Sequence, residues 1–138
     1  GKKNGYVTDM RIEGIMQLQK ELGFNLILQY AEFSEKQAFD LAMHYASDVN
    51  TVICASDLMA IGALNALIQM NIFRKCCGFD GISLMGYAGK GMLTCKQDFY
   101  QISQRAVKEM HRLLSGEKGR NVFVEHEITS ISYQDVIS

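Results

Sequence analysis

The chain has 138 residues, of which 48% are hydrophobic and 21% are charged, a composition typical of one globular domain with a real core. Its formal net charge of −1 gives no reason to expect these residues to bind nucleic acid or an anionic membrane. No apolar run approaches the roughly 18 residues that span a bilayer, and the start GKKNGYVTDM lacks a signal-peptide core. We therefore expect these residues not to associate with a membrane. A cytoplasmic location is expected from the cysteine usage described below.

The periodicity of the apolar residues predicts alternating helices and strands. Thr8 is expected to cap the first helix and Gly23 to end it. Ser34 and Gln37 have the spacing of a capping box, which predicts the start of a second helix. The expected elements, in chain order, are helix 8–22, strand 25–30, helix 34–47, strand 51–55, helix 56–70, strand 75–80, strand 93–97, helix 98–115, and one or two strands in 121–138.

This order of elements predicts an α/β fold of three layers, with a mainly parallel sheet between helices on both faces. The run TVICA (51–55) is short, apolar and β-branched, as buried parallel strands are. Ligands of such sheets bind beyond the carboxyl ends of the strands. Polar residues that follow these strands are therefore candidates for a binding site.

Ser56 follows the strand TVICA, Asp80 follows the run KCCGF, and Arg11 lies near the start of the first helix. A guanidinium, a carboxylate and a hydroxyl at one edge suit the vicinal hydroxyls of a sugar, and Phe33 offers an aromatic face for its C–H surface. Each residue also has a structural explanation. Ser56 can be only an N-cap, Arg11 a solvated helix charge and Phe33 a core residue. Asp80 can be part of a turn with Gly81, and Asp57 a carboxylate that complements the helix dipole.

Catalytic and metal-binding patterns are weak. The run GYAGKG (86–91) lacks the spacing of a P-loop, and no serine lies in a nucleophile elbow. The histidines lack metal-ligand spacing, and we expect no metal, cofactor or enzymatic activity. We expect the four cysteines, Cys54, Cys76, Cys77 and Cys95, to be small buried side chains in a reducing compartment. Disulfide pairing, or an α/β enzyme that uses Cys76 or Cys77 as a thiolate, is the alternative.

Several motifs together resemble one family. The runs ASDLMAIGALNAL, GFDG and LTCKQDF closely resemble the effector-binding core of the LacI/GalR family of bacterial transcription regulators. MRIEG resembles the Arg-x-x-Gly helix start of that family, and VEHEITS resembles its closing strand. The resemblance covers nearly the whole chain. It implies a periplasmic-binding-protein-like fold of type I, represented mostly by its C-terminal lobe.

The resemblance also implies roles for individual residues. Arg11, Ser56 and Asp80 match effector-contacting positions, Phe33 matches an aromatic residue that packs on the sugar, and Gln97 lies at the crossover between two lobes, within reach of the ligand. Asp57 would support these residues or cap its helix. Ser56 stands where the family more often has Asn, which leaves the identity of the sugar open.

A dimer interface is implied along the helix from Leu58 to Met70 and near Tyr87. This helix is apolar almost all round, which agrees with burial on two sides, although a helix buried within the chain would have the same composition. The interface residues expected from the resemblance are Ile61, Gly62, Asn65, Gln69 and Tyr87.

By the same resemblance, residues 1–97 and 119–138 form the C-terminal lobe, and the helix in 98–118 belongs to an N-terminal lobe, so its apolar face should be exposed here. The DNA-binding headpiece is expected to be absent from this chain. The expected function is sugar sensing by a homodimeric regulator, in which ligand binding between two lobes controls DNA binding through that headpiece, with either polarity of response. A periplasmic sugar-binding protein of an uptake system is the alternative.

Overall fold

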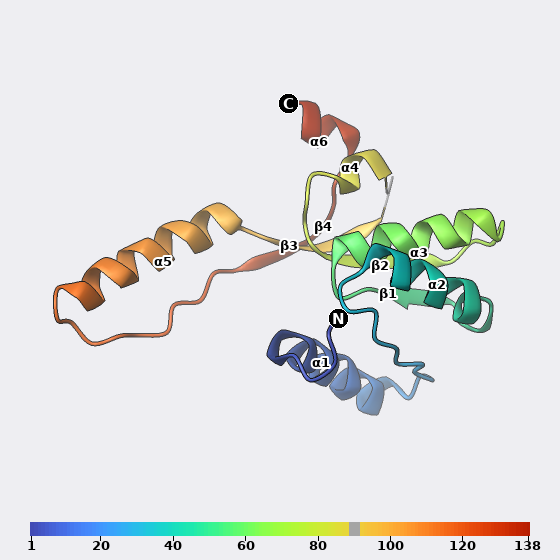
Figure 1. Cartoon of the computed structure of the whole chain (residues 1–138), viewed down its shortest axis with the longest axis horizontal. Coiled ribbons are helices and arrows are strands. Elements are labelled where there is room, and N and C mark those ends of the chain that lie inside the picture. Colours follow the sequence, from blue (N-terminus) through green and yellow to red (C-terminus); the bar gives the residue numbers. More distant parts are fainter. Residues whose placement is uncertain (89–91) are drawn as a thin grey trace.

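Figure 1 shows the computed structural model of the chain, which describes residues 1–88 and 92–138. The end of the GYAGKG run therefore lies outside the described residues. Among the helices described, none combines the length and the apolar character needed to cross a membrane. The elements are α1 (Tyr6–Leu22), α2 (Glu35–Tyr45), the 3-10 helix η1 (Ala46–Asp48), β1 (Thr51–Ile53), α3 (Asp57–Gln69), β2 (Lys75–Asp80), α4 (Met85–Ala88), β3 (Leu93–Gln97), α5 (Phe99–Leu114), β4 (His126–Ser130) and α6 (Tyr133–Ile137).

The four strands form one mixed sheet in the order β1-β2-β3-β4. The first three strands are parallel, and β4 runs antiparallel to β3, with Gln97 opposite His126. The carboxyl ends of β1, β2 and β3 therefore meet at one edge of the sheet, where β4 begins. We call this the carboxyl edge.

Helices cover both faces of the sheet, which confirms the predicted three-layer α/β class. The Cys76 thiol points toward α3, where it donates to the Ala60 carbonyl, whereas Phe79 lies under the Arg11 side chain of α1. Residues 76 and 79 of one strand point to opposite faces. Thus α1 lies on one face and α3 on the other, with α2 packed outside α3 (Figure 1).

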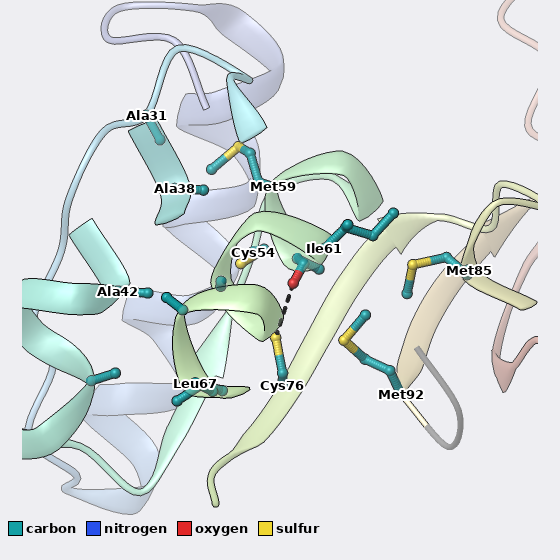
Figure 2. Packing of buried hydrophobic residues seen from close by; sticks show 14 of the residues in the cluster. Ala31, Ala38, Ala42, Cys54, Met59, Ile61, Leu67, Cys76, Met85 and Met92 are labelled. Atoms are coloured by element: carbon teal, nitrogen blue, oxygen red, sulfur yellow. Dashed lines mark hydrogen bonds between the residues drawn. The ribbon is translucent and has the colours of Figure 1, made fainter. Parts of the chain in front are cut away.

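Most of the core lies between the sheet, α3 and α2 (Figure 2). Small side chains let the two helices approach closely. A Cβ atom added to Gly62 would lie 2.2 Å from the Glu35 carbonyl oxygen. The alanines of the two helices are all buried: Ala38, Ala42, Ala60, Ala63 and Ala66.

Side-chain caps begin several helices, and two of these caps, Ser34 and Ser56, were predicted from the sequence. The Ser34 hydroxyl accepts from the Gln37 N–H at 3.3 Å, which confirms the start of α2. Ser56 caps α3 in the same way, and Asp98 caps α5. Thr8 is not a cap, because α1 begins earlier, after Gly5, and Thr8 is buried within its first turn.

The predicted strand at 25–30 is wrong. The segment has no regular structure, and Ile27 and Leu28 remain 44% and 40% exposed. A strand requires a neighbour to complete its hydrogen-bond ladder. This segment pairs with none of the four strands, so apolar character alone does not make it a strand.

The C-terminal tail holds one predicted strand, β4, and one element that the sequence reading missed. Residues 133–137 form the helix α6 instead of a second strand. The Ser132 hydroxyl accepts from the Asp135 N–H, and the Asp135 carboxylate accepts from the Ser132 N–H, so a capping box starts the helix. The short helix α4, which packs against α6, was also not predicted.

Helix α5 and the chain that follows it project from the carboxyl edge as an arm (Figure 1). The helix has no buried residue, and the prediction that its apolar face is exposed is confirmed. The most exposed apolar side chains of the arm are Tyr100, Val107, Met110, Leu114 and Phe123. The assignment of this helix to a second lobe stays a prediction.

Candidate ligand-binding site

Three of the predicted ligand-binding residues meet at the carboxyl edge. The Arg11 Nη2 atom lies 3.6 Å from the Asp80 Oδ1 atom, and the Gln97 amide donates to the same oxygen at 2.9 Å. Arg11 comes from α1, Asp80 is the last residue of β2, and Gln97 is the last residue of β3. We call these three residues the edge cluster.

Arg11 is held by more than its ion pair. Its guanidinium carbon lies 3.7 Å from the centroid of the Phe79 ring, and its Nη1 donates to the Ala55 carbonyl. The stacking and the carbonyl contact fix the plane of the guanidinium. The side chain is still 19% exposed, so it retains access to a ligand.

Asp80 is half-buried, with 26% of its side chain exposed. Burial raises the pKa of its carboxyl above the usual value. The Arg11 guanidinium and the hydrogen bond from Gln97 lower this pKa by less, and the Asp57 carboxylate adds a smaller rise. The backbone of Asp80 has φ +115°, a conformation that L residues rarely adopt. A strained, partly desolvated carboxylate at a sheet edge is typical of binding sites.

Ser56 acts as the N-cap of α3, as the structural explanation predicted. Its hydroxyl accepts from the Met59 N–H at 3.3 Å, and the residue is buried. Asp57 does more than complement the helix dipole. Its fully buried carboxylate accepts hydrogen bonds from the Gly81 and Ile82 N–H groups and from the Thr94 hydroxyl.

Phe33 is not joined to the edge cluster by any hydrogen bond, ion pair or ring contact in the described part of the chain. It lies in the turn before α2 with φ +57° and is 36% exposed, so it is not a core residue either. The sequence reading did not single out two residues that the structure adds, Phe79 under Arg11 and Thr94 beside Asp57. A polar threonine within the apolar strand run LTC was the available signal for Thr94.

The predicted interface residues fall into two groups. Ile61 and Gly62 are buried within this chain, where Gly62 faces the backbone of α2. Asn65, Gln69 and Tyr87 are exposed, and the Tyr87 ring packs edge-on against Tyr133 at 5.5 Å. Burial between α2 and the sheet therefore accounts for much of the apolar character of α3.

Comparison with known proteins identifies the fold. No family model matches the chain. A curated relative, the HTH-type transcriptional regulator MalR of Streptomyces coelicolor, is 25% identical, and the match covers 84% of this chain and 37% of MalR. A LacI family transcriptional regulator from Arthrobacter sp. FB24 superposes with a TM-score of 0.76 at 24% identity over 86% of this chain and 49% of that one.

A dimeric Lac repressor superposes with a TM-score of 0.80 at 20% identity, over 96% of this chain and 54% of the repressor chain. The chain has the fold of a LacI-family effector-binding domain. The resemblance seen in the sequence is thereby confirmed. The chain spans about half the length of these LacI-family structures and 37% of MalR.

The LacI-family proteins that the chain is similar to are regulators and not enzymes.

The surroundings of the four cysteines do not favour a catalytic thiolate. All four thiols are free, and Cys54, Cys76 and Cys95 are buried. The pKa of Cys76 is raised mainly by a hydrogen bond with Cys54 and, to a smaller extent, by burial. Burial also raises the pKa of Cys77. Both shifts disfavour the thiolate form that a nucleophilic cysteine needs.

The raised pKa of Asp80 predicts a pH-dependent gain from removing its charge. A carboxyl whose pKa is raised on folding stabilises the folded state fully below its ordinary pKa of 3.8, and this contribution is lost as the pH rises through the raised pKa. Asp80→Asn has no charge to bury. We expect its free energy of unfolding, relative to wild type, to increase between about pH 3.5 and pH 7.

Urea unfolding at a series of pH values measures this difference, and Asp40→Asn, on the exposed side of α2, is the matched surface control. A difference between Asp80→Asn and wild type that falls as the pH rises would contradict the prediction.

Proposed function

We propose that this chain is the effector-binding and dimerising part of a bacterial LacI/GalR-type transcriptional regulator. In this proposal the edge cluster contacts a small sugar or sugar derivative. The observation that carries it is the meeting of Arg11, Asp80 and Gln97 at the carboxyl ends of parallel strands, which is where ligands of such sheets bind.

The chemistry of the edge cluster suits a sugar. Each sugar hydroxyl both donates and accepts hydrogen bonds. The Arg11 guanidinium offers a fork of N–H donors, the Asp80 carboxylate accepts, and the Gln97 amide does both. The Arg11–Asp80 distance of 3.6 Å is longer than the roughly 2.7–2.9 Å of a close charge-assisted pair, so both groups keep hydrogen-bonding capacity for a ligand.

The arm supports a site between two lobes. The chain leaves the sheet after Gln97 and returns to it at His126, so the arm projects from the carboxyl edge, where the edge cluster lies. Because α5 buries none of its apolar face, we assign residues 98–118 to a second lobe that covers the edge cluster from outside. Closure of the two lobes on a ligand would then shift the balance between two arrangements of a dimer.

The regulator proposal includes a homodimer, with Asn65, Gln69 and Tyr87 as exposed interface residues, and control of DNA binding through a headpiece outside this chain. Among the structural neighbours, the Arthrobacter regulator was solved in complex with lactose, and a Lac repressor dimer was solved bound to operator. The likeness to these proteins and to MalR supports a cytoplasmic regulator and no enzyme, in preference to a periplasmic uptake protein. No cofactor is needed for this function.

A thermal-shift screen of the whole protein tests the proposal. Mono- and disaccharides and sugar phosphates are added one at a time, and a ligand of the folded state is expected to raise the melting temperature. At 100 times its Kd, such a ligand stabilises the protein by about 2.7 kcal/mol. If no sugar shifts the wild-type melting temperature, the sugar-sensing proposal is wrong, and a non-sugar effector or a protein partner takes its place.

A further inference from the structure

The turn that carries Asp80 is the most constrained part of the edge cluster. Asp80 has φ +115° and Gly81 has φ +75°. Glycine adopts such a backbone without strain, but an aspartate does not. The strain at Asp80 persists only if surrounding contacts hold the turn in place.

One buried carboxylate supplies those contacts. The Asp57 Oδ2 atom accepts from the Gly81 N–H at 2.7 Å and from the Ile82 N–H at 2.8 Å. The Thr94 hydroxyl donates to Asp57 Oδ1 at 2.6 Å and accepts from the Gly81 N–H at 3.2 Å. Asp57 is fully buried and Thr94 is 1% exposed, so water does not compete for these hydrogen bonds.

Two glycines allow close packing around the Asp57 carboxylate and the turn that it holds. A Cβ atom added to Gly78 would lie 2.1 Å from Asp57 Oδ1. A Cβ atom added to Gly81 would lie 2.5 Å from Lys96 Cγ. Gly78 thus leaves room for Asp57, at the start of α3, to reach the neighbouring strand β3, and Gly81 lets the turn pack closely against Lys96 of β3. The network therefore joins three chain segments directly behind Asp80.

We propose that Asp57 and Thr94 are positioning residues that hold Asp80 in its strained conformation, opposite Arg11 and Gln97, and so set the affinity of the edge cluster for its sugar. This inference rests on the proposed function. Asp57 and Thr94 do not touch the ligand, because both are buried beneath the turn. When the network is broken, the turn from Asp80 to Ile82 relaxes toward an unstrained backbone and carries the carboxylate away from Arg11.

Thr94→Val tests the inference with little change in shape. The variant removes the hydroxyl that donates to Asp57, and Thr94→Ser restores a hydroxyl. We expect Thr94→Val to weaken sugar binding by the whole protein at least about tenfold, and Thr94→Ser to bind within about threefold of wild type. Cys76→Ala, a core truncation outside the network, is the control for a general loss of stability and is expected to bind as wild type does.

A double-mutant cycle distinguishes positioning from a purely structural role. If Thr94 acts through Asp80, then Thr94→Val should have no further effect on affinity in an Asp80→Ala background. An equal loss of affinity in both backgrounds, or wild-type affinity of Thr94→Val itself, would overturn the inference.

A readout without ligand separates this inference from the proposed function. Thr94→Val should speed amide hydrogen exchange at Gly81 and Ile82 and move the Asp80 carboxyl titration, followed by NMR, toward its ordinary value. If no sugar binds the wild-type protein, the proposed function fails, and these two measurements still decide whether the network positions Asp80. Unchanged exchange and an unchanged titration would overturn the positioning role.

Discussion

Arg11→Ala is expected to weaken binding of the sugar effector by about 10- to 100-fold, the loss expected when charge-assisted hydrogen bonds are removed from a half-buried site. The variant removes the N–H fork and leaves the Asp80 carboxylate without its cation. Arg11→Lys should recover only part of the affinity. A lysine keeps the charge, but it cannot reproduce both the fork and the stacking on Phe79.

Arg74→Ala is the matched control for this experiment. Arg74 also binds main-chain carbonyls, those of Ala46 and Ser47, but it lies at the opposite end of β2 from the edge cluster. We expect Arg74→Ala to lower stability by about 1 kcal/mol and to leave the affinity for sugar unchanged. Equal affinities for Arg11→Ala and Arg74→Ala in isothermal titration would show that Arg11 does not contact the ligand.

Gly62→Ala is expected to destabilise the folded protein by about 2–3 kcal/mol. An alanine Cβ would lie 2.2 Å from the Glu35 carbonyl oxygen, so α2 and α3 must separate to admit it. The two helices bury most of the core on that face of the sheet, and the separation weakens their packing. Denaturant unfolding measures the loss.

Gly14→Ala is the control, because it should increase the free energy of unfolding where Gly62→Ala lowers it. A Cβ atom at this position in α1 meets nothing within 4 Å. The substitution should therefore stabilise the protein by up to about 1 kcal/mol through helix propensity alone. If Gly62→Ala instead unfolds as wild type does and only weakens the dimer, then Gly62 faces a second copy, as the family resemblance implied, and not α2.

The sequence predicted those parts of the fold that depend on local pattern. The strands β2 and β3 were predicted at their observed bounds, because a short apolar run next to polar residues is a local signal. The caps at Ser34 and Ser56 were predicted for the same reason. The segment 25–30 was misread as a strand, because pairing depends on a neighbour that periodicity does not show.

For the candidate site, too, the sequence predicted some residues from local pattern and could not predict others. The rule that ligands bind at the carboxyl ends of parallel strands was enough to bring Arg11 and Asp80 together. Gln97 came only from the family resemblance. The Asp57–Thr94 contact joins residues 37 positions apart, and no local pattern encodes it. Phe33 was proposed to contact the sugar both from its position before the second helix and from the resemblance, yet in the described part of the chain no hydrogen bond, ion pair or ring contact joins it to the edge cluster.

The most direct test of the account is a calorimetric titration of the whole protein with the sugar that the thermal-shift screen identifies, in wild type, Asp80→Ala and Asp40→Ala. Asp40 is a surface carboxylate on α2 that pairs with Lys36, so its removal controls for the loss of one negative charge. We expect wild type and Asp40→Ala to bind with equal affinity and Asp80→Ala to lose affinity by at least about 100-fold. Wild-type affinity in Asp80→Ala would contradict the central claim that the edge cluster holds the effector.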